Sequence, residues 1–471
     1  MASVSIPAEA ICVISRLMQV ILLAKARKKH KAKYDNSIAI MLKSGLQGII
    51  TEMAADPSSF VVHPGKDFTR KRKLDLETLI NLILSMKGGS IGKEMFDYFG
   101  GDVSMATTSA FIQQRSKLKV EAFEHLFHSF NKLSAGMDTH TYDGYRMLAV
   151  DGSDINIATN PNSDTYFEQG FNQFHLNALY DILNKTYFDA IIQPAPKEHE
   201  RRAAIEMVER HIYPEKTILI ADRGYESFNF IEHINRVENL HYLVRVKNGG
   251  AKEIRELPMK ALDTDISFEL RTTQTNKDKE DYAKGIAKYI AGKSKFGKEK
   301  HTSWDFESPF VVKQRVVRFE ISPGNYETII TSLDRFRFPP EKIKELYHLR
   351  WGIETSFREL KYAIGVINFH SKIEDFIIQE IFAMLTMYNF CERITMSVVI
   401  EQKDGNKHVY QVNFTMAIHV CRDFFALPIS RPPPDVFAQI ERYILPVREG
   451  RADRRKLKTK SAIMFTYRVA A

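Results

Sequence analysis

Apolar residues repeat at helical spacing through the first third of the chain. The first clear run contains Leu76, Leu79, Ile80, Ile83 and Leu84, and Gly88-Gly89 follow it. A second run, from Thr107 to Lys132, has apolar positions at Phe111, Leu118, Phe123, Leu126, Phe127 and Phe130. This spacing is typical of amphipathic helices that end at glycine. Residues 1–145 are therefore predicted to be mostly helical.

From Arg146 onward the pattern favours strands. Short apolar stretches cover residues 147–150, 175–183, 186–192, 216–222 and 241–247. Helical spacing separates some of them, at 198–211 and 228–237. A run of strands followed by alternating helix and strand predicts a mixed α/β sheet. We assign residues 146–247 to the first part of an α/β domain.

Residues 248–332 alternate between apolar and polar positions. The stretches 266–273, 310–322 and 325–333 surround a polar, lysine-rich loop at 275–300. This alternation predicts an antiparallel sheet inserted into the α/β domain. A long amphipathic helix is then expected from about Pro340 to Ile364, with further helix to about Val399, so that residues 333–404 complete the domain. Residues 405–471 are predicted to be a helical, basic region.

The charge of the chain favours a polyanionic partner. It has 67 Lys and Arg against 58 Asp and Glu, a formal charge of +9, and its basic residues are clustered at 25–33, 70–73 and 451–460. Basic side chains on short helices neutralise DNA phosphates, so Arg115, Lys117 and Lys119 are candidate DNA contacts. The alternative for each of them is a solvated helix face. We expect residues 1–145 to bind DNA.

The cysteines and an apolar segment near the N-terminus indicate the cellular location of the protein. The three cysteines, Cys12, Cys391 and Cys421, lie far apart, which argues against a disulfide framework or a cysteine zinc site and fits a reducing cytosol. The apolar segment 11–24 is too short to cross a bilayer and contains Arg16. We interpret it as a packed helix and predict no membrane role.

Two aspartates occupy the same local context. Asp151 follows the apolar strand 147–150 and precedes Gly152, and Asp222 follows the strand 216–221 and precedes Arg223-Gly224. Open α/β sheets present active-site groups at the carboxyl ends of their strands. If the two strands are neighbours, the two carboxylates form a site for a hard cation such as Mg²⁺. The alternative is that each is an ordinary turn residue.

The predicted helix at 340–364 carries a third acid. On a helix of about 100° per residue, one stripe about 80° wide is polar; it contains Tyr347, Arg350, Glu354, Arg358 and Lys361. An adjoining apolar stripe would dock the helix on the sheet, and Glu359 points away from the polar stripe. An acid flanked by basic groups suits a metal-bound phosphodiester, whereas the alternative is a solvated face with helical ion pairs.

Four stretches of the chain resemble the DDE transposases of the insertion-sequence-four group. The spacing Tyr347-x2-Arg350-x3-Glu354-x6-Lys361 matches the YREK signature of that group. The stretches LAVDGSDI and ILIADRGY around the aspartates and DFTRKRKLDLETLINLIL near the N-terminus are also similar. A gap of 131 residues separates Asp222 from Glu354, where the group carries a β-strand insertion.

This resemblance implies an RNase H-like catalytic domain with Asp151, Asp222 and Glu354 as catalytic and metal-binding triad. Tyr347, Arg350 and Lys361 become contacts to the DNA backbone, and Arg358 and Arg223 join them as predicted contacts. The implied cofactor is Mg²⁺, two ions per active site, with Mn²⁺ as a substitute. A tryptophan that stabilises a flipped base in the family has Trp304 as its candidate here, and packing within the insertion is the alternative.

The implied activity is cut-and-paste DNA transposition. Two metal ions about 3.5–4 Å apart activate the attacking oxygen and stabilise the leaving oxygen. The expected partners are double-stranded DNA and a second copy of the chain in a homodimer, in the bacterial cytoplasm at the nucleoid. The DNA comprises the target and the transposon ends, and residues 1–145 are expected to bind the ends. Two rivals stay open: a nuclease of the same fold without strand transfer, and a DNA-binding protein that has lost its chemistry.

Overall fold

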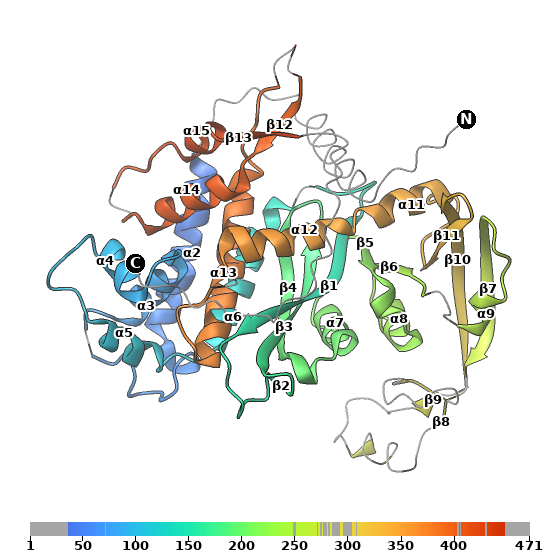
Figure 1. Ribbon diagram of the computed structural model, residues 1–471, viewed down its shortest axis with the longest axis horizontal. Helices are drawn as coiled ribbons and strands as arrows, with labels where there is room; N and C mark the ends of the chain where they lie inside the picture. Colours follow the sequence, from blue (N-terminus) through green and yellow to red (C-terminus); the bar gives the residue numbers. More distant parts are fainter. Residues whose placement is uncertain are drawn as a thin grey trace.

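The computed structural model describes residues 36–447 except most of 271–303 and short gaps at 71, 139, 248–250, 308, 367, 403–404, 406 and 429–430. The predicted helix at 11–24 and the basic clusters at 25–33 and 451–460 therefore lie outside the described residues. Within the described part, a helical body lies beside a body built on one large sheet (Figure 1).

The helical body combines segments from both ends of the chain. Its N-terminal helices are α2 (Ser37–Ala55), α3 (Leu76–Ser85), α4 (Ile91–Tyr98), α5 (Thr108–Arg115) and α6 (Glu121–Ser134). Its C-terminal helices are α13 (Glu374–Thr395), α14 (Phe414–Ala426) and α15 (Val436–Glu441), with a strand pair, β12 (Val409–Val412) and β13 (Ile444–Val447). All eight helices contribute to one hydrophobic core. The predicted helix at 76–84 is confirmed as α3, and the predicted helical pair at 107–132 as α5 and α6.

Helix α2 is, among the described residues, the one helix long and apolar enough to cross a membrane by length and composition. Its buried positions instead pack with α3 and α6 in the helical core. The Lys43 ammonium, also buried, donates to the carbonyl oxygens of Phe424 and Leu427 at 2.7 and 2.5 Å. These contacts are those of a core helix that joins the two ends of the chain.

The second body is a nine-stranded mixed sheet. Strands β1 (Arg146–Ile157), β3 (Phe171–Asp181) and β4 (Thr186–Pro194) pair antiparallel, and the short β2 (Tyr166–Phe167) also pairs with β3. On the other side, β1, β5 (Thr217–Ala221) and β6 (Leu240–Arg245) pair parallel. Every residue of β5 is buried, as expected of a parallel strand covered on both faces. The predicted strands of residues 146–247 are confirmed.

The inserted strands continue this same sheet. Strand β11 (Asn325–Thr331) pairs antiparallel with β6, and β10 (Phe310–Ser322) and β7 (Leu262–Leu270) follow it outward. The predicted antiparallel strands are therefore present, but they extend the edge of the main sheet instead of forming a sheet apart. The insertion also contains α9 (Lys252–Arg255), β8 (Thr272–Thr273) and β9 (Lys293–Ser294).

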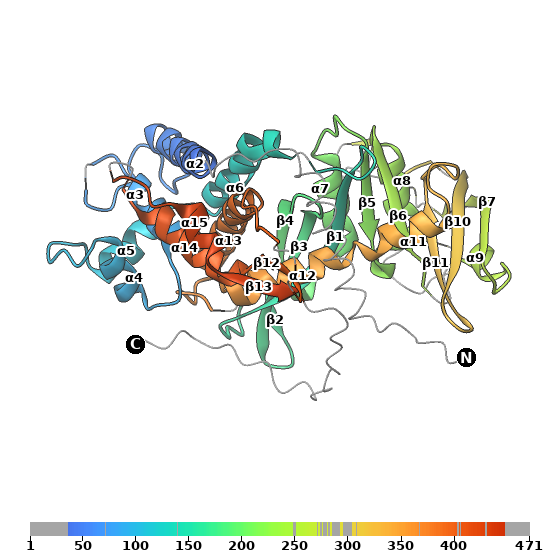
Figure 2. The same cartoon turned by 90° about the horizontal axis from the view of Figure 1, so that it is seen from above.

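Different helices cover the two faces of the sheet (Figure 2). Helices α7 (Glu200–Glu209) and α8 (Phe228–Asn235) pack on the face to which β1 contributes Leu148 and Val150. On the opposite face, Met147 and Ala149 belong to the core that includes α11 (Pro340–His348) and α12 (Trp351–Glu359). Because side chains alternate along a strand, residue 151 points to the second face and residues 152 and 154 to the first.

The predicted continuous helix at 340–364 is in fact broken. It consists of α11 (Pro340–His348), α12 (Trp351–Glu359) and a π-helical turn, η5 (Leu360–Ile364), and it ends at Gly365 with φ 102°. Between α11 and α12 the backbone N–H groups of Leu349 and Arg350 bond to carbonyls three residues earlier. This tighter turn interrupts the α-helical hydrogen bonding, and the local sequence contains no proline that would predict it.

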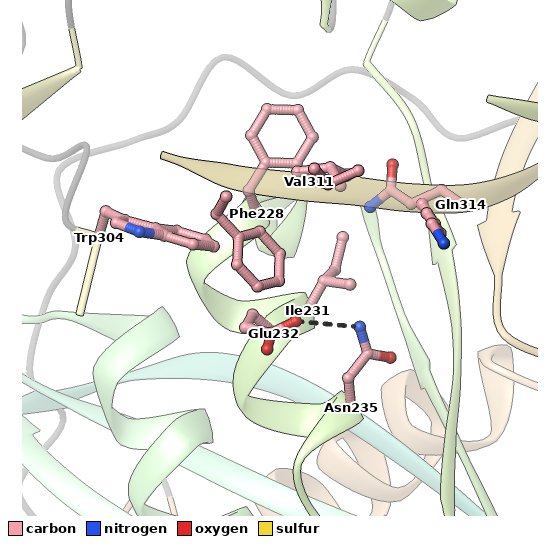
Figure 3. Close-up of a pocket in the computed structure, with 10 residues that line it drawn as sticks. Phe228, Ile231, Glu232, Asn235, Trp304, Val311 and Gln314 are labelled. Carbon is pink, nitrogen blue, oxygen red and sulfur yellow. Dashed lines mark hydrogen bonds between the residues drawn. The ribbon is translucent and has the colours of Figure 1, made fainter. Parts of the chain in front are cut away.

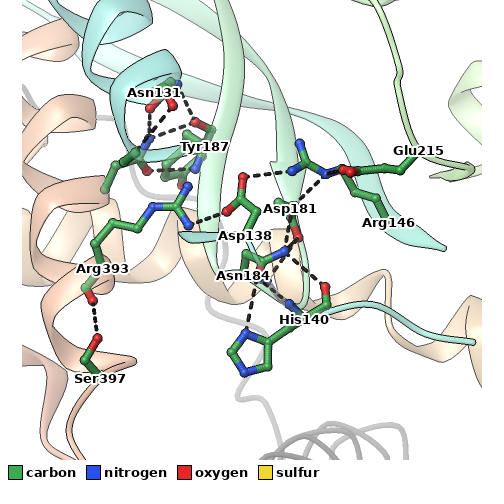
Figure 4. Close-up of polar contacts among 12 residues, drawn as sticks. Asn131, Asp138, His140, Arg146, Asp181, Asn184, Tyr187, Glu215, Arg393 and Ser397 are labelled. Atoms are coloured by element: carbon green, nitrogen blue, oxygen red, sulfur yellow. Dashed lines mark hydrogen bonds and ion pairs between the residues drawn. The ribbon is translucent and has the colours of Figure 1, made fainter. Parts of the chain in front are cut away.

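A buried polar network joins the two bodies (Figure 4). Asp138 accepts from Arg146 at 2.8 Å at the start of β1 and also forms an ion pair with Arg393 of α13. Nearby, the Asn389 amide of α13 donates to Asn131 of α6 at 2.7 Å and to the carbonyl oxygen of Tyr187 at 2.8 Å. The first strand of the sheet is thus anchored to the helical body.

Candidate active site

Asp151 and Asp222 lie side by side at the carboxyl end of two neighbouring parallel strands. The parallel pairing of β1 with β5 ends at Val150↔Ala221, and each aspartate comes next. The condition for the predicted cation site, that the two strands are neighbours, is therefore met. One detail was wrong: β1 does not end at Asp151 but continues to Ile157, because it keeps pairing with β3.

Local backbone contacts orient both aspartates. Asp151 Oδ1 accepts from the Gly152 N–H at 2.9 Å. Asp222 caps a short 3₁₀ helix, η4 (Arg223–Tyr225), and accepts from the Gly224 N–H at 2.6 Å. A Cβ at Gly224 would lie 2.8 Å from Asp222 Oδ1. Glycine at position 224 therefore leaves room for the Asp222 carboxylate.

Arg350 links Glu354 to Asp151. Its Nη2 lies 2.7 Å from Glu354 Oε1, and its Nη1 lies 3.7 Å from Asp151 Oδ2. The break before α12 places Arg350 at the start of this helix, one turn before Glu354. The guanidinium therefore bridges carboxylates that are more than 200 residues apart in sequence.

The electrostatics of Asp151 show that three acids are close. Burial raises the pKa of Asp151 to about 6, Arg350 opposes this rise, and the charges of Asp222 and Glu354 add to it. Burial likewise raises the pKa of Tyr347 to about 12, with Asp222 among the charges that act on it. Carboxylates crowded in this way are stabilised by a cation placed between them.

The predicted DNA contacts around this centre differ in exposure. Arg223 and Arg358 are exposed, and Lys361 is half-buried, with its ammonium donating to the carbonyl oxygen of Asp154 at 2.7 Å. Tyr347 and Arg350 are buried. The Tyr347 hydroxyl and Arg350 Nε have no hydrogen-bond partner within the described part of the chain. Arg223 follows Asp222 directly, and the other four residues lie on the segment α11–α12–η5 that carries Glu354.

Arg115 was wrongly predicted to contact DNA. It is fully buried, donates to Gln379 and Glu380 at 2.9 Å each, and donates to the carbonyl oxygen of Phe376 at 2.5 Å. Its guanidinium is therefore used to attach α5 to α13. Lys117 and Lys119 are partly exposed, so their assignment to DNA stays a prediction.

The side chains of Glu359 and Glu354 point to different sides of the helix. Its carboxylate accepts from the Tyr388 hydroxyl of α13 at 3.1 Å, whereas Glu354 faces Arg350. The expectation that the two glutamates lie on different sides of the helix agrees with these contacts, despite the break before α12.

Trp304 is buried in the insertion (Figure 3). It is 2% exposed, its indole N–H donates to the carbonyl oxygen of Glu307 at 3.0 Å, and its ring packs against Phe306 and Phe310. With Phe228 and Asn235 it lines a pocket of about 150 Å³. These contacts favour the packing alternative over an exposed role in base stabilisation.

Sequence reasoning missed a second charged cluster close to Asp151. His175 on β3 is paired directly with Asp154 on β1, and Glu198 and Glu200 approach the same imidazole. The only sequence signal was an acid three residues after Asp151. The partner histidine is supplied by strand register, which the local pattern does not give.

Comparison with known proteins decides the family. Residues 142–390, just over half of the chain, match the transposase DDE domain family. This chain belongs to the DDE transposases. It is also 24% identical over 343 residues to the transposase InsG of insertion sequence element IS4 from Escherichia coli strain K12, a match that covers 68% of this chain and 70% of that protein. The resemblance to the insertion-sequence-four group is confirmed.

A solved structure with a similar course of the chain is a piggyBac transposase synaptic complex with hairpin DNA. The match covers 84% of this chain and 81% of that chain, at 10% sequence identity and a TM-score of 0.42. A likeness of this size does not refine the site of this transposase.

Proposed function

We propose that this transposase binds the ends of its own element, cuts the DNA there and joins the cut ends to a target, with Asp151, Asp222 and Glu354 as its catalytic residues. The observation that carries the proposal is the convergence of these three acids on one edge of the sheet, with Arg350 between two of them. An RNase H-like domain is supported by the strand order β4-β3-β1-β5-β6, antiparallel on one side of β1 and parallel on the other.

The three acids fit divalent metal, which DDE transposases as a family use. Carboxylate oxygens are the preferred ligands of Mg²⁺, and Mn²⁺ accepts the same ligands. Burial raises the pKa of Asp151, and the charges of Asp222 and Glu354 add to this rise; a cation bound between the acids would oppose it. We assign two Mg²⁺ ions to Asp151, Asp222 and Glu354; bound there, they would supply charge neutralisation at the reacting phosphate.

The basic residues around the acids would hold the DNA backbone. The exposed Arg223 and Arg358 and the half-buried Lys361 can reach phosphates at the surface. Arg350 now neutralises Glu354 and Asp151, so metal at these acids would release its guanidinium toward a phosphate. Tyr347, whose hydroxyl is unpaired next to Arg350, would then complete the contact.

Cut-and-paste transposition requires that two DNA ends be handled together. We therefore propose a homodimer on double-stranded DNA, acting at the bacterial nucleoid in the cytoplasm. The support is the family assignment and the formal charge of +9. The helical body, which joins residues 36–134 to the C-terminal helices, is the part we assign to end binding.

The test is a reaction of the full chain with Mg²⁺, a linear DNA that carries the terminal repeats of the element, and a target plasmid. Cleavage at the ends followed by joining to the plasmid is the expected result. Asp222→Asn should bind the ends but lose both steps, whereas Asp164→Asn, an exposed carboxylate paired with Lys197, should keep them. Cleavage without joining would identify a nuclease, and binding without cleavage a protein that has lost its chemistry.

A further inference from the structure

The face of the sheet opposite Asp151 carries a separate group of metal-ligand side chains. Asp154 on β1, His175 on β3 and Glu198 before α7 place one ligand atom each within 4.8 Å of one another. Asp154 and His175 are direct partners across the β1–β3 pair. By strand alternation both point toward α7, while Asp151 points toward α12. This group is therefore distinct from the acids assigned to catalysis.

Two carboxylates meet at a single imidazole nitrogen. His175 Nδ1 lies 2.7 Å from Asp154 Oδ1 and 2.8 Å from Glu198 Oε2. One ring nitrogen carries at most one proton, so it cannot make a linear hydrogen bond to both oxygens. A cation that contacts the nitrogen and both oxygens would satisfy all three atoms at once. Three carboxylates surround this ring, those of Asp154, Glu198 and Glu200. They leave an excess of negative charge even when the imidazole is protonated.

The His175 imidazole is buried and packs directly over Gly152. Its side chain is 6% exposed, and a Cβ at Gly152 would lie 2.1 Å from Nε2, so the ring can occupy this position only because residue 152 is glycine. Nε2 is buried without a well-aligned hydrogen bond, and it lies 3.2 Å from Glu200 Oε1. Metal-bound histidines characteristically turn their second nitrogen toward a carboxylate. A fixed, buried ring aimed at two acids is a prepared ligand.

We propose that Asp154, His175 and Glu198 bind one divalent transition-metal ion, of the Mn²⁺ or Zn²⁺ type, on the α7 face of the sheet. The imidazole favours these ions over Mg²⁺, which takes oxygen ligands. Nδ1, Oδ1 and Oε2 are the ligand atoms, and Glu200 orients the ring through Nε2. The ion ties β1 to β3 and to the start of α7. It would thereby fix the segment of β1 between Asp151 and Asp154, whose carbonyl oxygen also holds Lys361.

The experiment separates this site from the catalytic acids. Full-length protein carrying Asp151→Asn, Asp222→Asn and Glu354→Gln is titrated with Mn²⁺ and followed by electron paramagnetic resonance, with Zn²⁺ as competitor. One Mn²⁺ should still bind. Adding Asp154→Asn and Glu198→Gln should weaken this binding by at least about 100-fold, whereas Asp164→Asn, a carboxylate outside the cluster, should leave it unchanged.

A second measurement needs no change in the cluster. Mn²⁺ bound to the protein with the catalytic acids neutralised should show electron-spin-echo coupling to one histidine nitrogen, and His175→Gln should remove that coupling. The proposal is overturned if neither Mn²⁺ nor Zn²⁺ binds that protein, if binding survives Asp154→Asn with Glu198→Gln, or if the bound Mn²⁺ has no nitrogen coupling. Because the catalytic acids are already removed, none of these outcomes bears on the proposed transposition.

Discussion

Arg115 and Arg350 were both predicted from sequence as DNA contacts, and both are buried, yet their surroundings differ. All partners of Arg115 are buried as well, including Glu380, whose side chain is 2% exposed. Arg350 contacts two carboxylates that still reach solvent, at 22% exposed for Asp151 and 35% for Glu354. A buried arginine has a structural role when its partners are also buried. When its partners remain exposed to metal and DNA, the arginine can be part of a functional site.

The largest expected effect that sharpens this comparison is on stability. Arg115→Met should lower the free energy of unfolding by about 3–5 kcal/mol, since it leaves Glu380 without its main counter-ion inside the helical core. Arg350→Met should cost less, about 2 kcal/mol at most, because its partners can be hydrated. Denaturant unfolding of the two variants at neutral pH is the measurement. Equal losses would mean that the exposure of the partners does not distinguish the two arginines.

Replacing Asp151 is expected to have a smaller effect on stability, and of the opposite sign. The pKa of Asp151 is raised from 3.8 to about 6 in the folded protein, so ionisation of this group favours the unfolded state. The contribution of Asp151 to the free energy of unfolding should therefore become less favourable as the pH rises from about 4 to 6. Above pH 6 this destabilisation should remain constant. Asp151→Asn removes the cost and should stabilise the metal-free protein by on the order of 1–2 kcal/mol at pH 7.

The control for that prediction is the pH itself. Thermal melting of Asp151→Asn and wild type in the presence of a chelator should differ most at pH 7 and converge near pH 4. A variant that melts below the wild type at pH 7, or by a margin that does not change with pH, would contradict the burial and charge crowding described for Asp151.

The smallest effect concerns the neighbours of Arg115. Lys117 and Lys119 are partly exposed, so replacing both with Ala should leave stability nearly unchanged. If they contact phosphates, the double variant should bind DNA of every sequence more weakly. The slope of the logarithm of the binding constant against the logarithm of salt concentration should also become shallower by about 1 per lost contact. Filter binding or a gel shift over a salt series measures this. An unchanged slope would assign both lysines to a solvated surface.

The sequence predicted most elements because their patterns are local. The buried run of β5 and the apolar repeats of α3 and α6 depend only on neighbouring residues. The placement of Asp151 beside Asp222 could also be predicted, since parallel strands bring equivalent ends together. Three features could not be predicted. The break at Leu349, the burial of Arg115 against α13 and the pairing of His175 with Asp154 depend on tertiary packing or strand register.

The central claim is that Glu354, and not its neighbour Glu359, completes the catalytic acids. The most direct measurement is the rate of cleavage of a terminal-repeat DNA at saturating DNA and Mg²⁺, for Glu354→Gln and Glu359→Gln. Glu354→Gln should lose at least about 10³-fold in rate, or ~4 kcal/mol, while it stays folded. Glu359→Gln should keep most activity and lose about 1 kcal/mol of stability with its hydrogen bond to Tyr388. A folded but inactive Glu359→Gln beside an active Glu354→Gln would contradict the proposed site.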